Sequence, residues 1–173
     1  MSENPVWDLC VIGAGPGGYA AAMRAHDLGK RVLLIEKDRV GGTGLHEGAL
    51  SSKTMWHLSS DYATAKLTDR GYRAPGGIDV TYSSVMESVN SAVSERRAIL
   101  NRQLEVLEKP NDKGATVTLV RGTAVFTDTH HVEVTRPDGT KQTYEAKNFV
   151  LATGSHPRIP KEYPVDGETI VTS

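Results

Sequence analysis

A run of closely spaced glycines near the N-terminus is the part of the sequence best suited to bind phosphate. Residues 13–18 read Gly-Ala-Gly-Pro-Gly-Gly, which is a G-x-G-x-x-G pattern. Gly13 allows a tight turn, Gly15 lets the backbone approach a pyrophosphate, and Gly18 lets a helix pack closely on a strand. The phosphates then lie at the positive end of the helix that follows. The pattern therefore predicts a dinucleotide-binding turn.

A carboxylate follows at the spacing that this kind of site requires. Glu36 lies 18 residues after Gly18 and ends an apolar segment. At that position a carboxylate can accept hydrogen bonds from the hydroxyls of a ribose. The glycine pattern and this acid predict a dinucleotide, but they do not distinguish NAD from FAD.

Three segments must surround these residues if the site is to form. Val6–Ile12 is a short apolar run typical of a buried strand, and Arg31–Glu36 is a second one. Tyr19–Leu28 is alanine-rich and typical of a helix, with Gly29 as its C-terminal stop. A strand, a glycine turn, a helix and a strand within about thirty residues form a βαβ unit and imply a parallel sheet. The sequence therefore predicts an α/β, Rossmann-like domain.

Two further helices are predicted after this unit. Gly41–Gly48 is interpreted as a glycine-rich loop, and Ser51–Lys66 is predicted to be a helix that Ser51 or Ser52 could cap. Tyr82–Leu107 is predicted to be one long helix. The apolar residues that recur along it at helical spacing are Val85, Val89, Ala92, Val93, Leu100, Leu104 and Leu107.

The C-terminal half of the chain changes to the two-residue period of strands. Thr116–Val120 and His131–Thr135 alternate apolar and polar residues, and a Pro-Asp-Gly turn leads to Lys141–Glu145. These three segments are predicted to form a small antiparallel meander. Asn148–Ala152 is predicted to be another buried strand, and the proline-containing segment after it is predicted to be extended.

A second glycine-rich loop narrows the choice of cofactor. Residues 41–53 read Gly-Gly-Thr-Gly-Leu-His-Glu-Gly-Ala-Leu-Ser-Ser-Lys. They resemble the flavin-contacting redox loop of the pyridine nucleotide-disulfide oxidoreductases, whose pattern is G-G-T-C-x-x-x-G-C-x-P-S-K. Gly122-Thr123-Ala124 resembles the strand of that family that contacts the adenosine half, and Ala152-Thr153-Gly154-Ser155 resembles its A-T-G-S turn. The resemblance covers nearly the whole chain in the family's order and favours FAD.

The resemblance also implies how the chain is organised around the cofactor. Residues 1–155 would form an FAD-binding domain with a central parallel sheet and a small antiparallel meander. Residues 156–173 would be an extended exit segment toward a nicotinamide-binding domain that is not present in this chain, and NAD(P)H would be the donor through that domain. The residues expected to contact FAD are Ile12, Gly13, Gly15, Pro16, Gly17, Gly18, Glu36, Lys37, Gly42, Thr43, Gly48, Lys53, Thr123, Ala124, Ala152, Thr153 and Gly154.

Two substitutions remove the usual chemistry of the family. Gly44 and Ala49 stand where the family has its two redox cysteines, and Ser51 replaces the proline of the pattern. Disulfide reduction needs a thiolate nucleophile, which neither glycine nor alanine supplies. We therefore expect reduced FAD to pass electrons to a non-disulfide, small-molecule acceptor, in a quinone-reducing (diaphorase-like) or transhydrogenase-like reaction.

Two residues of the same segment are candidates for catalysis. The resemblance implies that Lys53 lies near the flavin N5, where a cation favours the anionic reduced flavin. His46, with Glu47 beside it, could exchange protons with a bound acceptor. The alternative for the chain as a whole is a non-catalytic FAD- or ADP-binding module, or a subunit of a split enzyme.

Composition bears on the other functional classes. The 173 residues include 20 Lys and Arg against 21 Asp and Glu, so no basic surface for nucleic acid is expected. There is no apolar stretch near the roughly 18 residues of a membrane span and no secretory signal, so a cytoplasmic location is expected. Cys10 is expected to be buried, and His130-His131 to face solvent without binding a metal. The parent protein is expected to be a homodimer, or to pair with a chain that supplies the missing domains.

Overall fold

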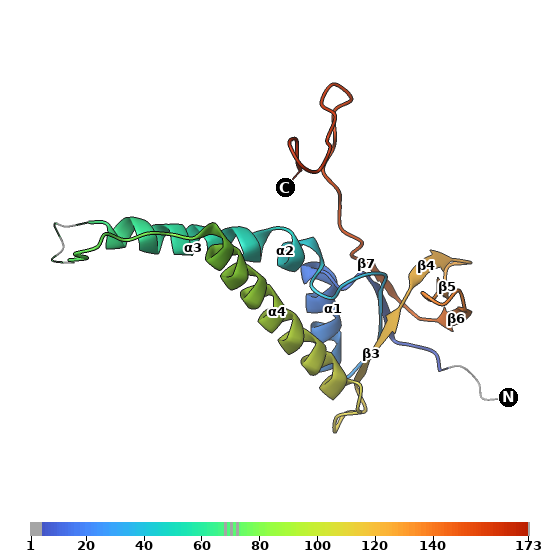
Figure 1. Ribbon diagram of the computed structural model, residues 1–173. Helices are drawn as coiled ribbons and strands as arrows, with labels where there is room; N and C mark the ends of the chain where they lie inside the picture. The colour runs from blue at the N-terminus through green and yellow to red at the C-terminus, as the bar shows by residue number, and fades with distance from the viewer. Residues whose placement is uncertain (1–4, 68, 70, 72, 173) are drawn as a thin grey trace. The chain divides into compact units, whose positions relative to one another are not determined.

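Four parallel strands form the central sheet of the protein (Figure 1). The computed structural model describes residues 5–67, 69, 71 and 73–172. The strands are β1 (Leu9–Ile12), β2 (Arg31–Glu36), β3 (Thr116–Arg121) and β7 (Phe149–Leu151), in the order β3-β2-β1-β7. The fold divides into two compact units, residues 1–42 with 100–173 and residues 43–99, and all four strands belong to the first. The predicted α/β class with a parallel sheet is confirmed.

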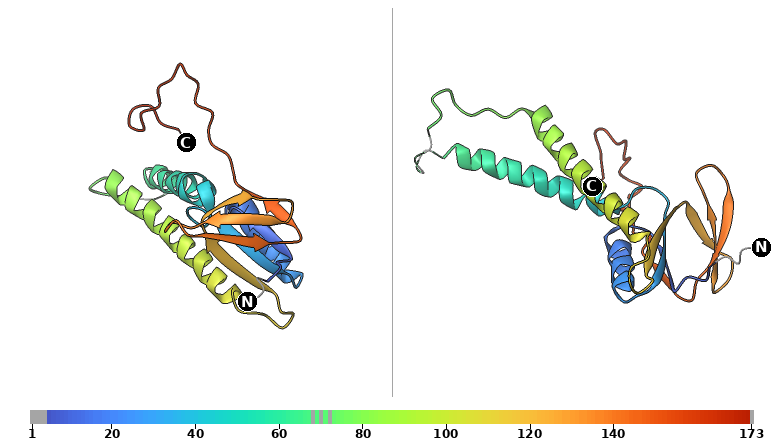
Figure 2. Two further views of the ribbon diagram at one scale, coloured as in Figure 1. Left: turned by 90° about the vertical axis from the view of Figure 1, so that its right-hand side faces the viewer. Right: turned by 90° about the horizontal axis from the view of Figure 1, so that it is seen from below.

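Both faces of the parallel sheet are covered, as Figure 2 shows. On one face, α1 (Pro16–Asp27) packs on β1 and β2 and buries Ala22 and Ala25. On the other face the sheet shares a hydrophobic cluster with a smaller sheet. The buried members of this cluster are Cys10, Leu33, Ile35, Val120, Val132, Val134, Tyr144 and Ala146. Because the central parallel strands are covered on both faces, β2 is apolar at four consecutive positions, Val32 to Ile35.

The smaller sheet is an antiparallel meander, as predicted, but one predicted strand is wrong. It consists of β4 (Thr123–Phe126), β5 (His131–Thr135) and β6 (Lys141–Glu145), in that order. The predicted first strand of the meander, Thr116–Val120, belongs instead to the parallel sheet as part of β3. β3 lies at the edge of that sheet, where Val117 is buried and Thr116 and Thr118 are only half-buried. Incomplete cover at the edge gives β3 the alternating sequence that is typical of a meander strand.

Two other strands differ from their predictions. β1 begins at Leu9 rather than at Val6, and Trp7 makes only an isolated parallel bridge with Ala146. The strand within Asn148–Ala152 is present as β7, but 67% of Leu151 is exposed rather than buried. β7 is an edge strand that pairs with β1 alone among the described strands, so its outer side lacks cover.

Two helices follow the βαβ unit before the long one. α2 (Gly42–His46) lies within the segment predicted to be a loop. α3 (Ala49–Ala65) begins two residues earlier than predicted and has Gly48 as its N-cap, with no side-chain cap hydrogen bond. The predicted capping by Ser51 or Ser52 is therefore wrong. The Ser52 hydroxyl instead donates to the carbonyl of Gly48 (2.8 Å).

α4 (Tyr82–Leu107) spans the residues predicted for the long helix. Of its apolar positions, Val89, Leu100 and Leu104 are buried. The boundary between the two units falls within this helix, after Ile99. In the described part of the chain, no helix combines the length and the apolar character that crossing a bilayer would require.

Candidate dinucleotide-binding site

The first glycine motif lies at the carboxyl edge of the parallel sheet. The strand register pairs Ile12 of β1 with Ile35 of β2 and with Leu151 of β7. Gly13 donates its N–H to the Ile35 carbonyl (2.8 Å), and Ala152 donates its N–H to the Ile12 carbonyl (2.8 Å). The glycine turn, the end of β2 and the turn after β7 are therefore neighbours.

Two glycines of the turn are required by the packing of the protein itself. Gly13 has a φ of +102°, and a Cβ on it would lie 2.3 Å from the carbonyl oxygen of Ala152. A Cβ on Gly18 would lie 1.8 Å from the carbonyl oxygen of Gly13. Both distances are far below van der Waals contact, so only glycine allows the turn and the close approach of α1 to β1.

The other two glycines of the motif have no such packing requirement. A Cβ on Gly17 would meet no heavy atom within 4 Å, and one on Gly15 would come no closer than 3.9 Å, to the Cα of Gly42. Gly15 has a φ of −70°, which any residue can adopt. Glycine at these positions therefore leaves open the space that a pyrophosphate needs beside the backbone. The residues fit the phosphates of a dinucleotide.

The start of α1 offers backbone donors to these phosphates. The helix begins at Pro16, three residues before the predicted start, because proline is favoured in the first turn of a helix. Its N-cap, Gly15, makes no side-chain cap hydrogen bond, and no acidic residue lies in the first turn. A helix N-terminus leaves N–H groups without intrahelical partners and carries partial positive charge, so it can receive an anion.

Glu36 is buried directly beside the glycine turn. Its Oε2 accepts the N–H of Ala14 (2.6 Å) and its Oε1 accepts the N–H of Asp38 (2.8 Å), while only 8% of the residue is exposed. A carboxylate can accept about four hydrogen bonds, so each oxygen retains the capacity for a ribose hydroxyl. Lys37 follows in the same turn and is exposed. The position of Glu36 fits the ribose contact predicted for it.

The meander begins next to Glu36. The register pairs Glu36 with Arg121, the last residue of β3, and Gly122 donates its N–H to the Glu36 carbonyl (3.0 Å). Thr123 and Ala124 follow immediately as the first residues of β4. The structure therefore brings these two residues to the same edge as the predicted ribose site.

The turn after β7 supports the glycine turn. The Cβ of Ala152 lies 3.1 Å from the point where a Cβ on Gly18 would stand, so Ala152 packs tightly against this glycine. Thr153 and Gly154 follow Ala152 and are exposed. Ala152 therefore shapes the turn, and the two residues after it are accessible to a ligand.

The second loop, residues 41–53, belongs from Thr43 onward to the unit formed by residues 43–99. Gly42 belongs to the first unit, has a φ of +56°, and a Cβ on it would lie 2.9 Å from the Cα of Gly15. A Cβ on Gly48 would lie 3.3 Å from the carbonyl oxygen of Thr43, which makes this a tight loop. His46 ends α2 and is half-buried, and Lys53 is exposed near the start of α3. Thr43 and His46 in α2, Gly48 between the helices and Lys53 in α3 thus belong to one short segment of the chain, in a different unit from the glycine turn.

The positions of the two missing cysteines lie on α2 and α3. Gly44 is inside α2 and Ala49 is the first residue of α3. Gly44 is not one of the glycines with a positive φ, so the backbone does not require glycine there. Cys10 cannot supply the missing redox thiol, because it is fully buried in β1 and burial raises the pKa of its thiol to about 12. The loss of the redox thiols is therefore not imposed by the backbone.

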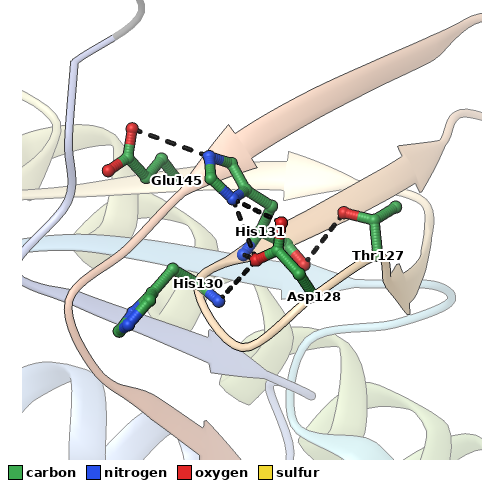
Figure 3. A network of polar contacts seen from close by, with 5 residues as sticks. All are labelled: Thr127, Asp128, His130, His131 and Glu145. Atoms are coloured by element: carbon green, nitrogen blue, oxygen red, sulfur yellow. Dashed lines mark hydrogen bonds and ion pairs between the residues drawn. The ribbon is translucent and has the colours of Figure 1, made fainter.

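The paired histidines at the start of β5 join a polar cluster, shown in Figure 3. His131 Nδ1 lies 2.9 Å from both carboxylate oxygens of Asp128, and its Nε2 lies 3.7 Å from Glu145 Oε2. Asp128 also accepts the backbone N–H groups of His130 (2.7 Å) and His131 (2.9 Å). The hydrogen bond to Asp128 raises the pKa of His131. Within the described ranges, no three His, Cys, Asp or Glu side chains are grouped to hold a metal ion.

Sequence reasoning missed the groups that hold Glu36. They are the backbone amides of Ala14 and Asp38. Next to them, the guanidinium of Arg121 donates to the carbonyl of Asp38. A backbone donor leaves no signal in the residue type. Arg121 does carry a signal, because it is a charged residue at the end of an apolar strand, directly before the Gly-Thr-Ala motif.

Known proteins of similar sequence span the same region. The family model of pyridine nucleotide-disulphide oxidoreductases matches residues 7–172. Dihydrolipoyl dehydrogenase of Chlorobaculum parvum is 34% identical over 172 residues, which cover 99% of this chain and 35% of that protein. The mitochondrial dihydrolipoyl dehydrogenase of Schizosaccharomyces pombe is 37% identical over 175 residues, covering 99% and 33%. The soluble pyridine nucleotide transhydrogenase of Vibrio cholerae is 34% identical over 163 residues, covering 94% and 33%.

A solved structure shows the same fold. The HOCl-induced flavoprotein disulfide reductase RclA from Escherichia coli, as its Cu(II) complex, superposes with a TM-score of 0.72 at 21% identity, covering 91% of this chain and 30% of that one. The chain thus spans about a third of the length of the relatives it matches. With its glycine turn, buried acid and second loop in the family's order and a family match from residue 7 to residue 172, the chain belongs to the pyridine nucleotide-disulphide oxidoreductase family.

Proposed function

We propose that this chain binds FAD and forms the FAD-binding portion of an NAD(P)H-dependent oxidoreductase whose acceptor is not a disulfide. Family membership supports FAD as the cofactor and oxidoreduction as the class of reaction. The acceptor rests on one observation. Gly44 and Ala49 stand at the positions of the family's redox cysteines, and the single thiol of the chain is the buried Cys10.

Each part of the dinucleotide site has a role toward FAD. The N–H groups at the start of α1 would receive the pyrophosphate in the space left by Gly15 and Gly17. Glu36 would accept the ribose hydroxyls, with Thr123 alongside the adenosine. FAD, when bound, supplies a two-electron carrier. Lys53 would place a positive charge near the flavin, which stabilises negative charge there by Coulomb attraction.

The α2–α3 segment would receive the acceptor. His46, with Glu47 next to it in the chain, carries an imidazole that could act as the general acid or base that the reduction of a quinone requires. A second pyridine nucleotide is the other candidate acceptor, because one relative is named a soluble pyridine nucleotide transhydrogenase. Neither acceptor needs a thiol on the protein.

The cofactor is tested on this chain alone. Titration with FAD should quench flavin fluorescence and leave a yellow protein after gel filtration. A protein that stays colourless with excess FAD would contradict the assignment of the cofactor.

The acceptor is tested on the parent protein, with NADH or NADPH as donor. We expect turnover with a quinone or with a second pyridine nucleotide, and none with a lipoamide disulfide. The double variant G44C/A49C is the matched control, because it restores the two thiols and should gain disulfide turnover. Disulfide turnover by the unmodified protein would contradict the proposal. A complete failure to oxidise NAD(P)H would favour a non-catalytic FAD-binding module.

A further inference from the structure

We infer that Arg121 is a positioning residue that holds Glu36 in the orientation that receives the ribose of an adenine nucleotide. This inference rests on the proposed binding of FAD. Arg121 is the last residue of β3 and stands opposite Glu36, the last residue of β2. Both residues therefore leave the parallel sheet at the same point of its carboxyl edge.

A series of hydrogen bonds connects the guanidinium of Arg121 to the carboxylate of Glu36. Nη1 of Arg121 donates to the carbonyl oxygen of Asp38. The N–H of Asp38 donates to Oε1 of Glu36 (2.8 Å). The two peptide groups that flank the Cα of Asp38 are thus both engaged, one by the acid and one by the arginine. Arg121 therefore fixes the donor that in turn orients the acid.

The turn that carries this donor needs such an anchor. Lys37 and Asp38 are exposed, so side-chain packing contributes little to holding this part of the turn, whereas Val40 further along it is buried. Its far end is anchored where Gly41 donates its N–H to the carbonyl of Ala14 (2.8 Å). Its near end is anchored by Arg121. Without the arginine, the Asp38 N–H would be held less firmly, and the carboxylate of Glu36 could then rotate away from the ribose hydroxyls.

The chemistry of arginine suits this position. Arg121 is half-buried, which reduces the screening of its charge by solvent. Its planar guanidinium is always charged and holds its donors in a fixed geometry, whereas a lysine presents a single flexible ammonium. A charge-assisted hydrogen bond to a carbonyl is about twice as strong as a neutral one. The tether is therefore strong enough to hold an exposed turn.

Binding of ADP and 2′-deoxy-ADP to this chain, measured by calorimetry, tests the inference. If Glu36 accepts the 2′-hydroxyl, the wild-type chain should prefer ADP by about tenfold. In R121Q the affinity for ADP should fall about tenfold, and the preference for ADP should shrink to about twofold. A change in the preference itself reports the orientation of Glu36, which a purely structural defect would leave unchanged.

The matched control is R39Q in the same turn. Arg39 pairs with the side chain of Asp38 (3.4 Å), so this variant removes the same charge while Arg121 keeps the carbonyl. R39Q should keep the wild-type preference. R121K, which retains the charge, should lie between R121Q and the wild type, and thermal unfolding should show that each variant is folded.

The possible results separate the inference from the proposed function. A wild-type preference in R121Q, or an equal loss of affinity for both nucleotides, would overturn the role of Arg121. So would the failure of both R121Q and R121K to fold, since Arg121 would then serve the stability of the fold. A wild-type chain that binds neither FAD nor ADP would instead contradict the proposed function, and the inference with it.

Discussion

The two halves of the proposed cofactor site are built in different ways. The glycine turn and Glu36 sit at the end of a sheet whose central strands are covered on both faces, and β4 of the smaller sheet begins beside Glu36. The α2–α3 segment belongs to the other unit, where α3 has no buried residue and where Leu45 and Val89 are the buried hydrophobic residues among those described. The half that contains the glycine turn is therefore fixed by a packed core, whereas the half that contains α3 has few buried residues.

This difference indicates where the sequence can change. At the glycine turn, Gly13 and Gly18 have backbone atoms within 2.3 Å of any added Cβ, so these positions are fixed by the fold whatever the ligand does. Gly44 has no positive φ, so its backbone conformation does not demand glycine. The half proposed to bind the adenosine can therefore persist while the half proposed to face the flavin diverges.

The largest effect should come from Gly18→Ala in the packed half. The added Cβ would meet the Gly13 carbonyl oxygen at 1.8 Å, and a backbone atom cannot move aside without disrupting the turn. We expect a loss of at least about 3 kcal/mol in the free energy of unfolding, or a Tm lower by roughly 6–12 °C. Thermal and urea unfolding measure it, and a variant as stable as the wild type would show that the turn is not tightly packed.

Hydrogen exchange compares the two halves directly. Amides of β2 belong to the central sheet, where Val32 to Ile35 are buried, while α3 buries none of its residues. Most of the stability of a helix in a protein comes from packing of its apolar face, which α3 lacks. We therefore expect amides of α3 to exchange more than about 100-fold faster than those of β2. Equal protection of the two elements would mean that the halves are equally well ordered.

Gly17→Ala separates packing from binding within the glycine motif. No heavy atom lies within 4 Å of the added Cβ, and alanine favours a helix over glycine by up to about 1 kcal/mol. Stability should therefore be unchanged or slightly higher. The affinity for ADP should fall about tenfold, because the methyl group occupies space that we assign to the phosphates. Calorimetry with ADP measures this, and an unchanged affinity would place the phosphates elsewhere.

Most of the packed half could be predicted from the sequence. The G-x-G-x-x-G turn, the alanine-rich helix and the acid at position 36 each follow from a local requirement of turn, helix or strand. Each is present, although the helix begins at Pro16, three residues before its predicted start. α4 also matches its predicted bounds, because its apolar spacing continues over the whole helix. A turn, helix or strand that is determined by neighbouring residues can therefore be predicted from the sequence alone.

The features that were predicted wrongly or missed depend on contacts between distant parts of the chain or on backbone groups. The sheet to which Thr116–Val120 belongs is decided by its pairing with β2, and an edge strand of either sheet would alternate in the same way. The N-cap of α3 is a glycine without a side-chain bond, so the serines nearby were misleading. The amides that hold Glu36 are backbone groups, which no residue type reveals.

The smallest effect should come from the polar cluster of the meander, which includes none of the residues proposed to bind the cofactor. The hydrogen bond to Asp128 raises the pKa of His131 above its usual 6.5, while the pKa of Asp128 is lowered, first by its bond from the His130 amide. A raised pKa in the folded state means that protonated His131 stabilises the fold. That contribution is fully present below the unfolded-state pKa of 6.5, and it is lost as the pH rises through the folded-state value.

The variant H131Q should therefore lower the Tm slightly at about pH 5.5, and the difference from the wild type should shrink by about pH 9. Asp128 stays ionised over this range because its pKa is lowered, so the change with pH belongs to His131. H130Q is the matched control, since His130 joins the cluster through its backbone N–H. It should shift the Tm equally at both pH values. Thermal unfolding of the wild type, H131Q and H130Q measures these differences in Tm. If the Tm difference between H131Q and the wild type grows with rising pH, His131 is not the protonated partner of Asp128.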